Sequence, residues 1–286
     1  MDRPTPVPAA PQVAGALRAA AVLGLDRLDA QLLLLLALGR PQHDRAWLLA
    51  HDDHALDAAT WETCQDLYRR RATDEPVAYL VGEKEFFGLP LQVDARVLVP
   101  RPDTETLVEW ALQVLDGQRD PVLLDLGTGS GAIALALQHA RPDARVDAVD
   151  ASPEALAVAQ DNAVRLGLPV QFACGDWLAG APGALYDLVV SNPPYIAEGD
   201  PHMAALAHEP RGALTAGPDG LDDLRSIVAQ APARLVPGGW LLLEHGHDQA
   251  TAVRALLDAA GFARVQSRTD LAGIERCSGG VQPGHR

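Results

Sequence analysis

Asp125-Leu126-Gly127-Thr128-Gly129-Ser130-Gly131 decides the fold of this 286-residue chain, because an apolar run ends there in a glycine-rich turn. Such glycines let the backbone pass close to a ligand, and a helix predicted to begin at Ala132 would direct its N-terminus toward a negative group. The spacing Gly127-x-Gly129-x-x-Ala132 also fits the loose fingerprint of dinucleotide-binding domains. The turn therefore predicts a nucleotide-type ligand beyond a strand and leaves the kind of ligand open.

Strand and helix patterns alternate around this turn. We expect strands at 122–125, 145–150, 170–173, 188–190 and 240–244, and helices at 132–140, 153–166, 221–235 and 248–260. A late hairpin is predicted from the segments 264–268 and 276–279. This order is typical of an α/β, Rossmann-like fold with a mostly parallel seven-stranded sheet, a late antiparallel hairpin and helices on both faces.

The first part of the chain has a different pattern. Between residues 11 and 78 the apolar spacing predicts only helices, at 13–23, 28–38, 45–50 and 58–71, the last behind Asp57 as its N-cap. The β-prone run 85–93, interrupted by Gly88 and Pro90, predicts a hairpin. We expect a helical bundle domain over 1–84, a hairpin linker over 85–98 and an α/β domain over 99–286.

Composition limits the partners and the compartment. The formal net charge of -15 argues against a nucleic acid bound over a broad surface, because such affinity comes largely from Lys and Arg. The single basic run, 69–71, is interpreted as a solvated helix face, with contact to RNA or an acidic partner left open. Three scattered cysteines, no signal-like N-terminus and no apolar stretch of about 20 residues predict a cytoplasmic protein without a membrane span.

Asn192-Pro193-Pro194-Tyr195 follows the strand-like run 186–191. The lone pair of a planar amide or nucleobase nitrogen is delocalised, so it attacks a methyl sulfonium only if it is held in line. The Asn oxygen and a carbonyl of the Pro-Pro segment could accept its two N–H hydrogens, and the Tyr ring could cover it. The alternative is that the prolines merely end a strand. Together with the glycine turn, the tetrapeptide indicates methyl transfer onto planar nitrogen.

Two further strand ends bear on the ligand. Asp150, about 20 residues beyond the turn, could accept both ribose hydroxyl hydrogens of a dinucleotide or of S-adenosylmethionine. Gly175-Asp176-Trp177 favours S-adenosylmethionine, since the carboxylate could bond the adenine amino group and the indole could pack on the purine. The alternatives are a loop N-cap for Asp176 and a surface-covering aromatic residue for Trp177.

At these residues the chain resembles the HemK/PrmC family of release factor glutamine methyltransferases, over nearly everything after its first few residues. The specific parts of the likeness are Pro100-Arg101-Pro102-Asp103-Thr104-Glu105 and the helical N-terminal domain, beside matching stretches at 71–88 and 191–196. The glycine turn belongs to many methyltransferases, and Asn-Pro-Pro-Tyr also occurs in nucleic-acid amino methyltransferases. The resemblance implies a class I methyltransferase domain over 99–286.

The resemblance implies transfer of a methyl group from S-adenosylmethionine to the side-chain N5 of the glutamine in the Gly-Gly-Gln motif of bacterial peptide chain release factors, leaving S-adenosylhomocysteine. The expected cofactor-binding residues are Gly127, Thr128, Gly129, Ser130, Gly131, Asp150, Asp176, Trp177 and Asn192. The expected catalytic and substrate-holding residues are Asn192, Pro193, Pro194 and Tyr195. Arg101 and Glu105 are candidates for orienting ligands or, alternatively, part of a helix-capping segment. The helical domain would bind the release factor, and we expect a monomer without direct nucleic-acid or membrane partners.

Two other functions stay open. A DNA or RNA amino-group N-methyltransferase would use the same tetrapeptide on a flipped base, but should show a basic face. A nonenzymatic adaptor with a decayed methyltransferase fold is disfavoured, because the glycine turn, Asp150 and the tetrapeptide are all present. His245-x-His247 lacks a third ligand at a recognisable spacing, so we expect turn histidines and no metal. Glu244, just before it, could line the cleft or cap the next helix.

Overall fold

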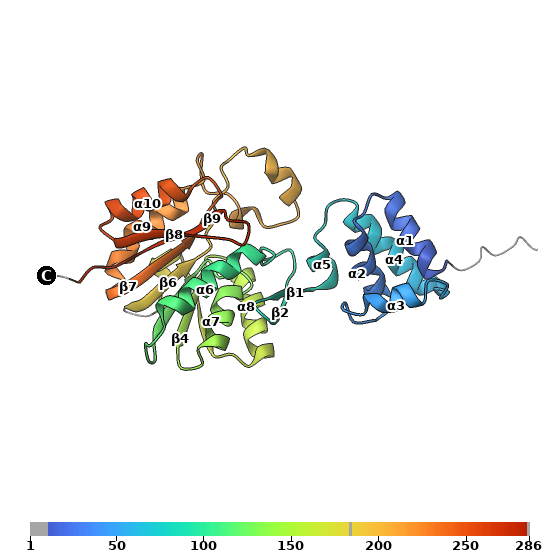
Figure 1. The fold of residues 1–286 in the computed structure, drawn as a ribbon, viewed down its shortest axis with the longest axis horizontal. Helices are drawn as coiled ribbons and strands as arrows, with labels where there is room; N and C mark the ends of the chain where they lie inside the picture. Colours follow the sequence, from blue (N-terminus) through green and yellow to red (C-terminus); the bar gives the residue numbers. More distant parts are fainter. Residues whose placement is uncertain (1–10, 183–184, 285–286) are drawn as a thin grey trace, which may run out of the picture. The chain divides into compact units, whose positions relative to one another are not determined.

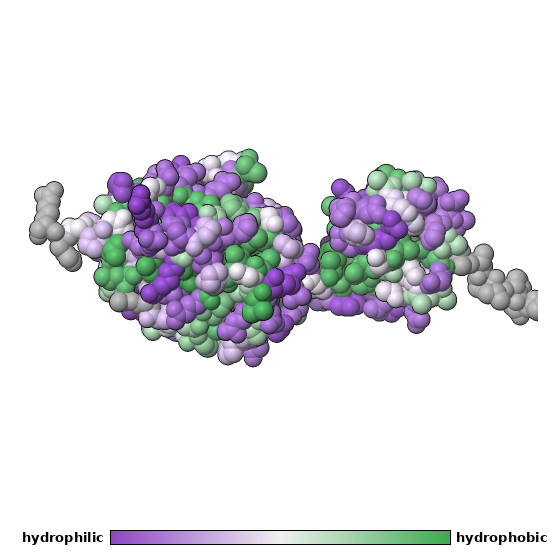
Figure 2. All heavy atoms as spheres, turned by 90° about the horizontal axis from the view of Figure 1, so that it is seen from below, coloured by the Kyte–Doolittle hydropathy of each residue, from purple (hydrophilic) through white to green (hydrophobic). Residues whose placement is uncertain are grey.

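The structure is a computed structural model that describes residues 11–182 and 185–284. The chain divides into two compact units, one ending at Gly82 and one beginning at Glu83 (Figure 1). Each unit encloses a hydrophobic core of its own. None of the helices in these ranges is long and apolar enough to cross a membrane. Hydrophilic and hydrophobic residues are interspersed over the visible surface of the second unit (Figure 2).

The first unit is the predicted helical bundle. Its helices are α1 Val13–Val22, α2 Arg27–Ala37, α3 Arg45–Ala50, α4 Ala58–Arg71 and α5 Val77–Val81. Asp26 and Asp57 cap α2 and α4, since their carboxylates accept backbone N–H groups at 2.7 Å. The buried Tyr68 hydroxyl donates to the Ala30 carbonyl at 3.2 Å and ties α4 to α2. Helix α5 was not predicted, because five residues are too few for a periodic pattern.

The second unit contains a seven-stranded sheet in the order β5-β4-β3-β6-β7-β9-β8 within the described residues. Its strands are β3 Val122–Leu126, β4 Arg145–Asp150, β5 Val170–Cys174, β6 Tyr186–Ser191, β7 Leu235–Glu244, β8 Ala263–Thr269 and β9 Glu275–Val281. The first five are parallel, and β9 runs antiparallel to both of its neighbours. The predicted sheet with its late antiparallel hairpin is confirmed. A separate hairpin pairs β1 Glu83–Phe86 with β2 Leu89–Gln92.

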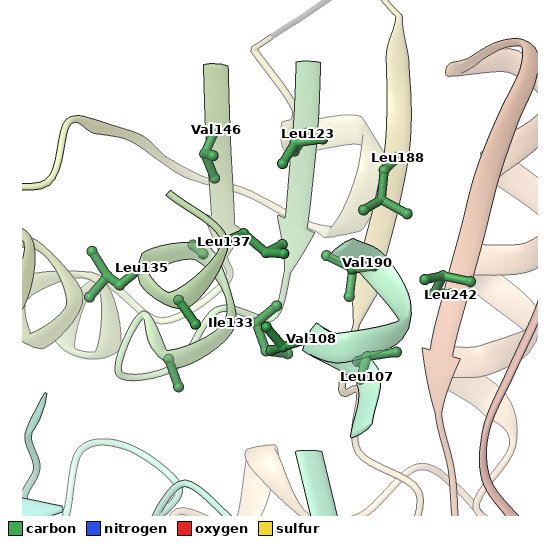
Figure 3. Packing of buried hydrophobic residues seen from close by; sticks show 14 of the residues in the cluster. Leu107, Val108, Leu123, Ile133, Leu135, Leu137, Val146, Leu188, Val190 and Leu242 are labelled. Carbon is green, nitrogen blue, oxygen red and sulfur yellow. The ribbon is translucent and has the colours of Figure 1, made fainter. Parts of the chain in front are cut away.

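Helices cover both faces of the sheet. One face packs against α6 Glu105–Val114, α7 Ala132–Ala140 and α8 Pro153–Leu166, and the other against α9 Asp222–Gln230 and α10 Ala250–Ala259. Figure 3 shows the first face, where Leu107 and Ile133 meet Val190 and Leu242 of the strands. Successive strand residues point to opposite faces, and because helices cover both faces, the central strands β3 Val122–Leu126 and β6 Tyr186–Ser191 are largely apolar.

In this unit, one predicted helix was too long and another helix was not predicted. The helix expected at 221–235 ends at Gln230, and β7 already begins at Leu235. Pro232 lacks a backbone N–H and its ring clashes with the preceding turn, so the segment after Gln230 continues only as one 3-10 turn. Helix α6 was not predicted, because Pro100 and Pro102 just before it favour an extended backbone.

The parallel strands end at one edge of the sheet. Leu126 pairs with Ser191, Asp150 with Cys174, and Ser191 with Leu243. The glycine turn, Asp150, the loop after β5 and the Asn-Pro-Pro-Tyr segment all follow these strand ends. Ligands bind in the crevice outside the carboxyl ends of such sheets. The fold therefore brings the predicted residues together at the place where a ligand is expected.

Candidate active site

A cavity of about 570 Å³ lies at this edge of the sheet. Its volume is within the usual range for small-molecule sites. Loops and the adjoining ends of strands and helices line it, namely Arg96, Val97, Leu98, Gly127, Gly129, Val149, Asp150, Ala151, Ser152, Ala155, Gly175, Asp176, Trp177, Asn192, Pro194, Pro210, Gly212, Ala213 and Asp223. Of the expected cofactor-binding residues, Thr128, Ser130 and Gly131 are outside this lining.

The glycine turn is fixed by backbone hydrogen bonds. The N–H groups of Gly127 and Thr128 both donate to the Val149 carbonyl, at 2.8 and 3.0 Å. Thr128 faces inward, since its hydroxyl donates to an Asp125 carboxylate oxygen at 2.7 Å. Gly131 leads into α7 with φ of 85°, and a Cβ there would meet Leu135 at 2.9 Å. Thr128 and Gly131 thus shape the turn, while Gly127 and Gly129 face the cavity.

Asp125 holds this turn through hydrogen bonds to Thr128 and Ala134. This role was not predicted from the sequence. The Asp125 side chain is buried, and it accepts the Ala134 N–H at 3.2 Å. Burial raises the pKa of Asp125 to about 7, against the lowering effect of the Thr128 and Ala134 hydrogen bonds. A carboxylate at the end of a central strand is the local signal that could have identified it.

Asp150 presents its carboxylate at the end of β4. One oxygen accepts the Gly129 N–H and the other accepts the Ser152 N–H, each at 2.9 Å. These two bonds fix the carboxylate plane, and each oxygen retains a lone pair for a further donor. Asp150 is therefore oriented toward a ligand in the cavity and tied to the glycine turn.

Trp177 packs against the glycine turn and lines the cavity beside it. A Cβ at Gly127 would lie 3.3 Å from Trp177 Cζ3, so the indole ring packs directly on the glycine. Burial raises the pKa of the neighbouring Asp223 carboxylate, against the lowering effect of the Trp177 indole. Asp176 lies beside it in the lining, and a Cβ at Gly175 would lie 2.5 Å from the Gly180 Cα, so this loop closes on itself.

The Asn-Pro-Pro-Tyr segment borders the same cavity. The Asn192 amide nitrogen donates to the Thr104 hydroxyl at 3.2 Å, and Pro194 lines the cavity while Pro193 is buried. The Tyr195 carbonyl accepts from Gln249 at 3.0 Å. Burial, followed by the charge of Glu244, raises the pKa of Tyr195 to about 12. Tyr195 is thus a neutral phenol around neutral pH.

Glu244 lies behind Asn192 at the end of β7. It is buried and outside the cavity lining. Burial raises its pKa to about 7, whereas the neighbouring Thr104 and Asn192 side chains lower it. The next helix begins at Ala250 without a side-chain cap. Neither sequence interpretation of Glu244, cleft lining or helix cap, describes this arrangement.

Arg101 and Glu105 lie outside the cavity lining. Arg101 donates to Glu209, which is buried and also accepts the Val99 N–H at 3.1 Å. Glu105 accepts the Phe87 N–H at 3.1 Å and so holds the turn of the β1–β2 hairpin. The wall near this segment comes instead from residues 96–98, and another from 210–213. Glu209 was missed because its loop has no periodic pattern and no motif.

The remaining charged and histidine motifs bond within the protein. His245 is buried, and its ring nitrogens bond the Gly246 carbonyl at 2.9 Å and the Ser278 hydroxyl at 2.8 Å. In the basic run, Arg70 pairs with Glu75 at 2.6 Å and Arg71 with Asp29 at 2.7 Å. These contacts agree with the interpretation of a helix face rather than a binding patch.

Comparisons with known proteins agree with this geometry. The model of the methyltransferase small domain matches residues 104–217, and that of the PrmC N-terminal domain matches 12–82. The release factor glutamine methyltransferase of Burkholderia pseudomallei is 54% identical over 269 residues, which cover 91% of this chain and 93% of that protein. Its counterpart in Bordetella pertussis is 53% identical over 260 residues, covering 90% and 95%.

The solved structures support the fold. A 16S rRNA methyltransferase of Thermus thermophilus, solved in complex with AdoMet and guanosine, gives a TM-score of 0.54 at 22% identity and covers 70% of this chain and 49% of that one. At this identity the likeness shows a shared methyltransferase fold and nothing finer. The resemblance drawn from the sequence is confirmed by the relatives: this chain belongs to the release factor glutamine methyltransferase family.

Proposed function

We propose that this chain methylates the side-chain amide nitrogen, N5, of the glutamine in the Gly-Gly-Gln motif of bacterial peptide chain release factors. One observation carries the proposal. The Asn192 amide, fixed through its nitrogen by Thr104, borders the same cavity as Gly127 and Asp150. A group that can hold a planar nitrogen thus lies beside a site suited to a nucleoside. The relatives named for this reaction match over nine-tenths of the chain.

The residues around the cavity fit S-adenosylmethionine. Because Gly127 has no side chain, its backbone can pack directly on the Trp177 ring. Both residues line the cavity, where a flat purine would pack on the indole. Asp150 would accept the ribose hydroxyls, and Asp176 the adenine amino group. The turn 127–131 would hold the amino-acid end near the start of α7, where backbone N–H groups favour a carboxylate. When bound, S-adenosylmethionine supplies an electrophilic methyl group and leaves as S-adenosylhomocysteine.

On the substrate side, this chain would orient an amide. Asn192 Oδ1 and the Pro193 carbonyl would accept the two N–H hydrogens of the glutamine, and the Tyr195 ring would cover the planar group. Holding both hydrogens turns the nitrogen toward the cavity, which supplies orientation rather than a strong base. Pro193 and Pro194 fix the direction of the carbonyl, because their φ angles are locked.

Arg101 and Glu105 enter the proposal as residues that hold the walls of the site. Arg101 bonds Glu209, which precedes the lining residues Pro210 and Gly212, and Glu105 bonds the hairpin turn at Phe87. Their contacts support a structural contribution more directly than contact with the substrate.

The proposal also includes a monomer in the cytoplasm. The three cysteines, Cys64, Cys174 and Cys277, are all free, and two of them are buried, which suits a reducing compartment. The release factor is the expected protein partner, with no direct nucleic acid.

The test is transfer of labelled methyl from S-adenosylmethionine to a purified bacterial release factor. The controls are the factor with Gly-Gly-Gln changed to Gly-Gly-Ala, and a DNA duplex. We expect label in the unchanged factor alone. Label in DNA, or equal label in the Gly-Gly-Ala factor, would contradict the proposed substrate.

A further inference from the structure

We infer that Glu244 and Thr104 are positioning residues for Asn192, which hold its amide with the nitrogen turned into the protein and the oxygen turned to the substrate. The inference rests on the function proposed above, because it assigns how the substrate amide is gripped. It concerns two side chains behind the cavity wall, whereas Asn192 itself lines the cavity.

The sheet places these side chains together. Ser191 of β6 pairs with Leu243 of β7, so Asn192 and Glu244 follow at the next position of two adjacent parallel strands. Thr104 precedes α6 and is 4% exposed, and Glu244 is 2% exposed. Water therefore has little access to this side of Asn192, and the protein's own groups decide its orientation.

An Asn amide has two nearly isosteric ends, and its hydrogen-bond partners decide which end points where. The Thr104 hydroxyl accepts from Asn192 Nδ2 at 3.2 Å, which leaves its hydrogen for the Glu244 carboxylate. An ionised carboxylate only accepts, so it favours the NH₂ end of Asn192 and disfavours the oxygen. The flipped amide would set its oxygen toward two acceptors. The observed orientation leaves Oδ1 free to accept from a substrate.

The charge on Glu244 is therefore part of the arrangement. It faces Asp103, Tyr195, Arg276 and Cys277. Arg276 is shared, since it bonds Asp270 at 3.1 Å and lies 3.7 Å from Asp103. Glu244 Oε2 has no hydrogen-bond partner within residues 11–182 and 185–284. Burial and the charge of Asp103 raise the pKa of Glu244, and Thr104, Arg276 and Asn192 lower it. The resulting pKa of Glu244 is about 7.

Protonation would change the role of Glu244. A carboxylic acid donates one hydrogen, and this hydrogen can bond Asn192 Oδ1 and withdraw it from the substrate. We therefore expect turnover to fall as the pH drops through about 7. Asp125 beneath the glycine turn also has a pKa of about 7, so the part of the fall that belongs to Glu244 is the difference between the wild type and a variant that lacks this carboxyl group.

The experiment compares the full-length wild type with Glu244→Gln, Thr104→Val and the control Asp147→Asn. Asp147 is also a fully buried carboxylate of the same sheet, but it bonds Tyr186 at 3.0 Å and Arg145 at 3.1 Å, outside the cavity lining. For each protein, kcat and KM for the release factor are measured between about pH 5.5 and 9, a range that brackets the expected pKa. Calorimetry gives the Kd for S-adenosylmethionine.

We expect Glu244→Gln and Thr104→Val to lower kcat by about 10- to 100-fold, the range for a displaced orienting group, with the Kd for S-adenosylmethionine changed by less than about 3-fold. The fall of kcat below about pH 7 should be smaller in Glu244→Gln than in the wild type and unchanged in Asp147→Asn, because Asp125 titrates in all three proteins. A fall in Glu244→Gln as large as that of the wild type, or an unchanged kcat, overturns this inference alone. A wild type that methylates no release factor overturns the proposed function and the inference with it.

Discussion

The indole ring of Trp177 packs against Gly127, so closely that a Cβ at Gly127 would lie 3.3 Å from the ring carbon Cζ3. Both residues have left-handed backbones, with φ of 68° at Gly127 and 43° at Trp177. For a tryptophan this conformation is unusual, and such conformations persist where the surrounding structure holds them. The contact joins the two loops that flank the cavity into one wall.

Gly127→Ala should therefore weaken S-adenosylmethionine binding. The methyl group must displace the Trp177 ring, and alanine is strained at a φ of 68°. We expect the Kd to rise by at least about 10-fold, equivalent to roughly 1.4 kcal/mol. Calorimetric titration measures it. The matched control is Gly117→Ala, where φ is 74° but a Cβ would meet nothing within 4 Å. Equal Kd values for the two variants would contradict the importance of the ring contact.

Asp150→Asn should also reduce the affinity. The amide retains one acceptor oxygen, so it cannot accept from both Gly129 and Ser152 and also hold two ribose hydroxyls. Loss of a hydrogen bond to a charged group costs about 1.5 to 3 kcal/mol, so the Kd should rise about 10- to 100-fold. Asp187→Asn serves as the control, because Asp187 accepts one backbone N–H at 2.8 Å outside the cavity lining. Comparable Kd increases in both would show a general loss of structure.

The sequence was informative where chemistry depends on a strand end. Asp150 and Asn192 follow apolar runs, and the carboxyl ends of parallel strands must lie on one edge, so their proximity follows from topology. Asp125 and Glu209 were not identified, because their roles depend on burial and on hydrogen bonds that no pattern encodes. Asp125 bonds Thr128 across a turn, and Glu209 bonds Val99, which is distant in the sequence. The side-chain contacts of Arg101 and Glu105 depend on loop packing, which no periodic pattern encodes.

Asn192→Ala should separate binding from turnover. It removes the proposed amide acceptor, which matters most in the transition state, and leaves Gly127, Asp150 and Trp177 unchanged. We expect the variant to lose about 2 to 4 kcal/mol of transition-state stabilisation, which lowers kcat/KM by roughly 30- to 1000-fold. Single-turnover kinetics and calorimetry measure the two effects separately. Near-normal turnover would refute the proposed role of Asn192.

Glu209→Ala should loosen the wall formed by Pro210, Gly212 and Ala213. It leaves the Val99 N–H and the Arg101 guanidinium without their shared acceptor. We expect a loss of about 2 kcal/mol of stability, because Glu209 is buried, together with an increased Kd for S-adenosylmethionine. In the control Glu83→Ala, the lost partner is Arg165 in an exposed pair, which contributes about 0 to 1 kcal/mol. Thermal unfolding and calorimetry of both variants provide the comparison, and equal losses would contradict the prediction.

Glu244→Gln should stabilise the protein in a manner that depends on pH. The folded pKa of about 7 exceeds the ordinary value of 4.5, so the folded state holds the proton more tightly than the unfolded chain. This contribution to wild-type stability is fully present below about pH 4.5 and is lost as the pH rises through 7. The glutamine does not titrate, so the variant avoids the loss, which is on the order of 1 to 3 kcal/mol.

Calorimetric melting at pH 5 and pH 8 tests this sign. We expect the Tm of Glu244→Gln to exceed that of the wild type by several degrees at pH 8, about 2 to 4 °C per kcal/mol, and by much less at pH 5. Asp125, whose pKa is also about 7, titrates in both proteins, so it cancels in the difference. A difference in Tm that is the same at both pH values would show that Glu244 does not change its charge in this range. A variant that is more stable yet slower would mean that the buried carboxylate is kept at a cost in stability, for the orientation of Asn192.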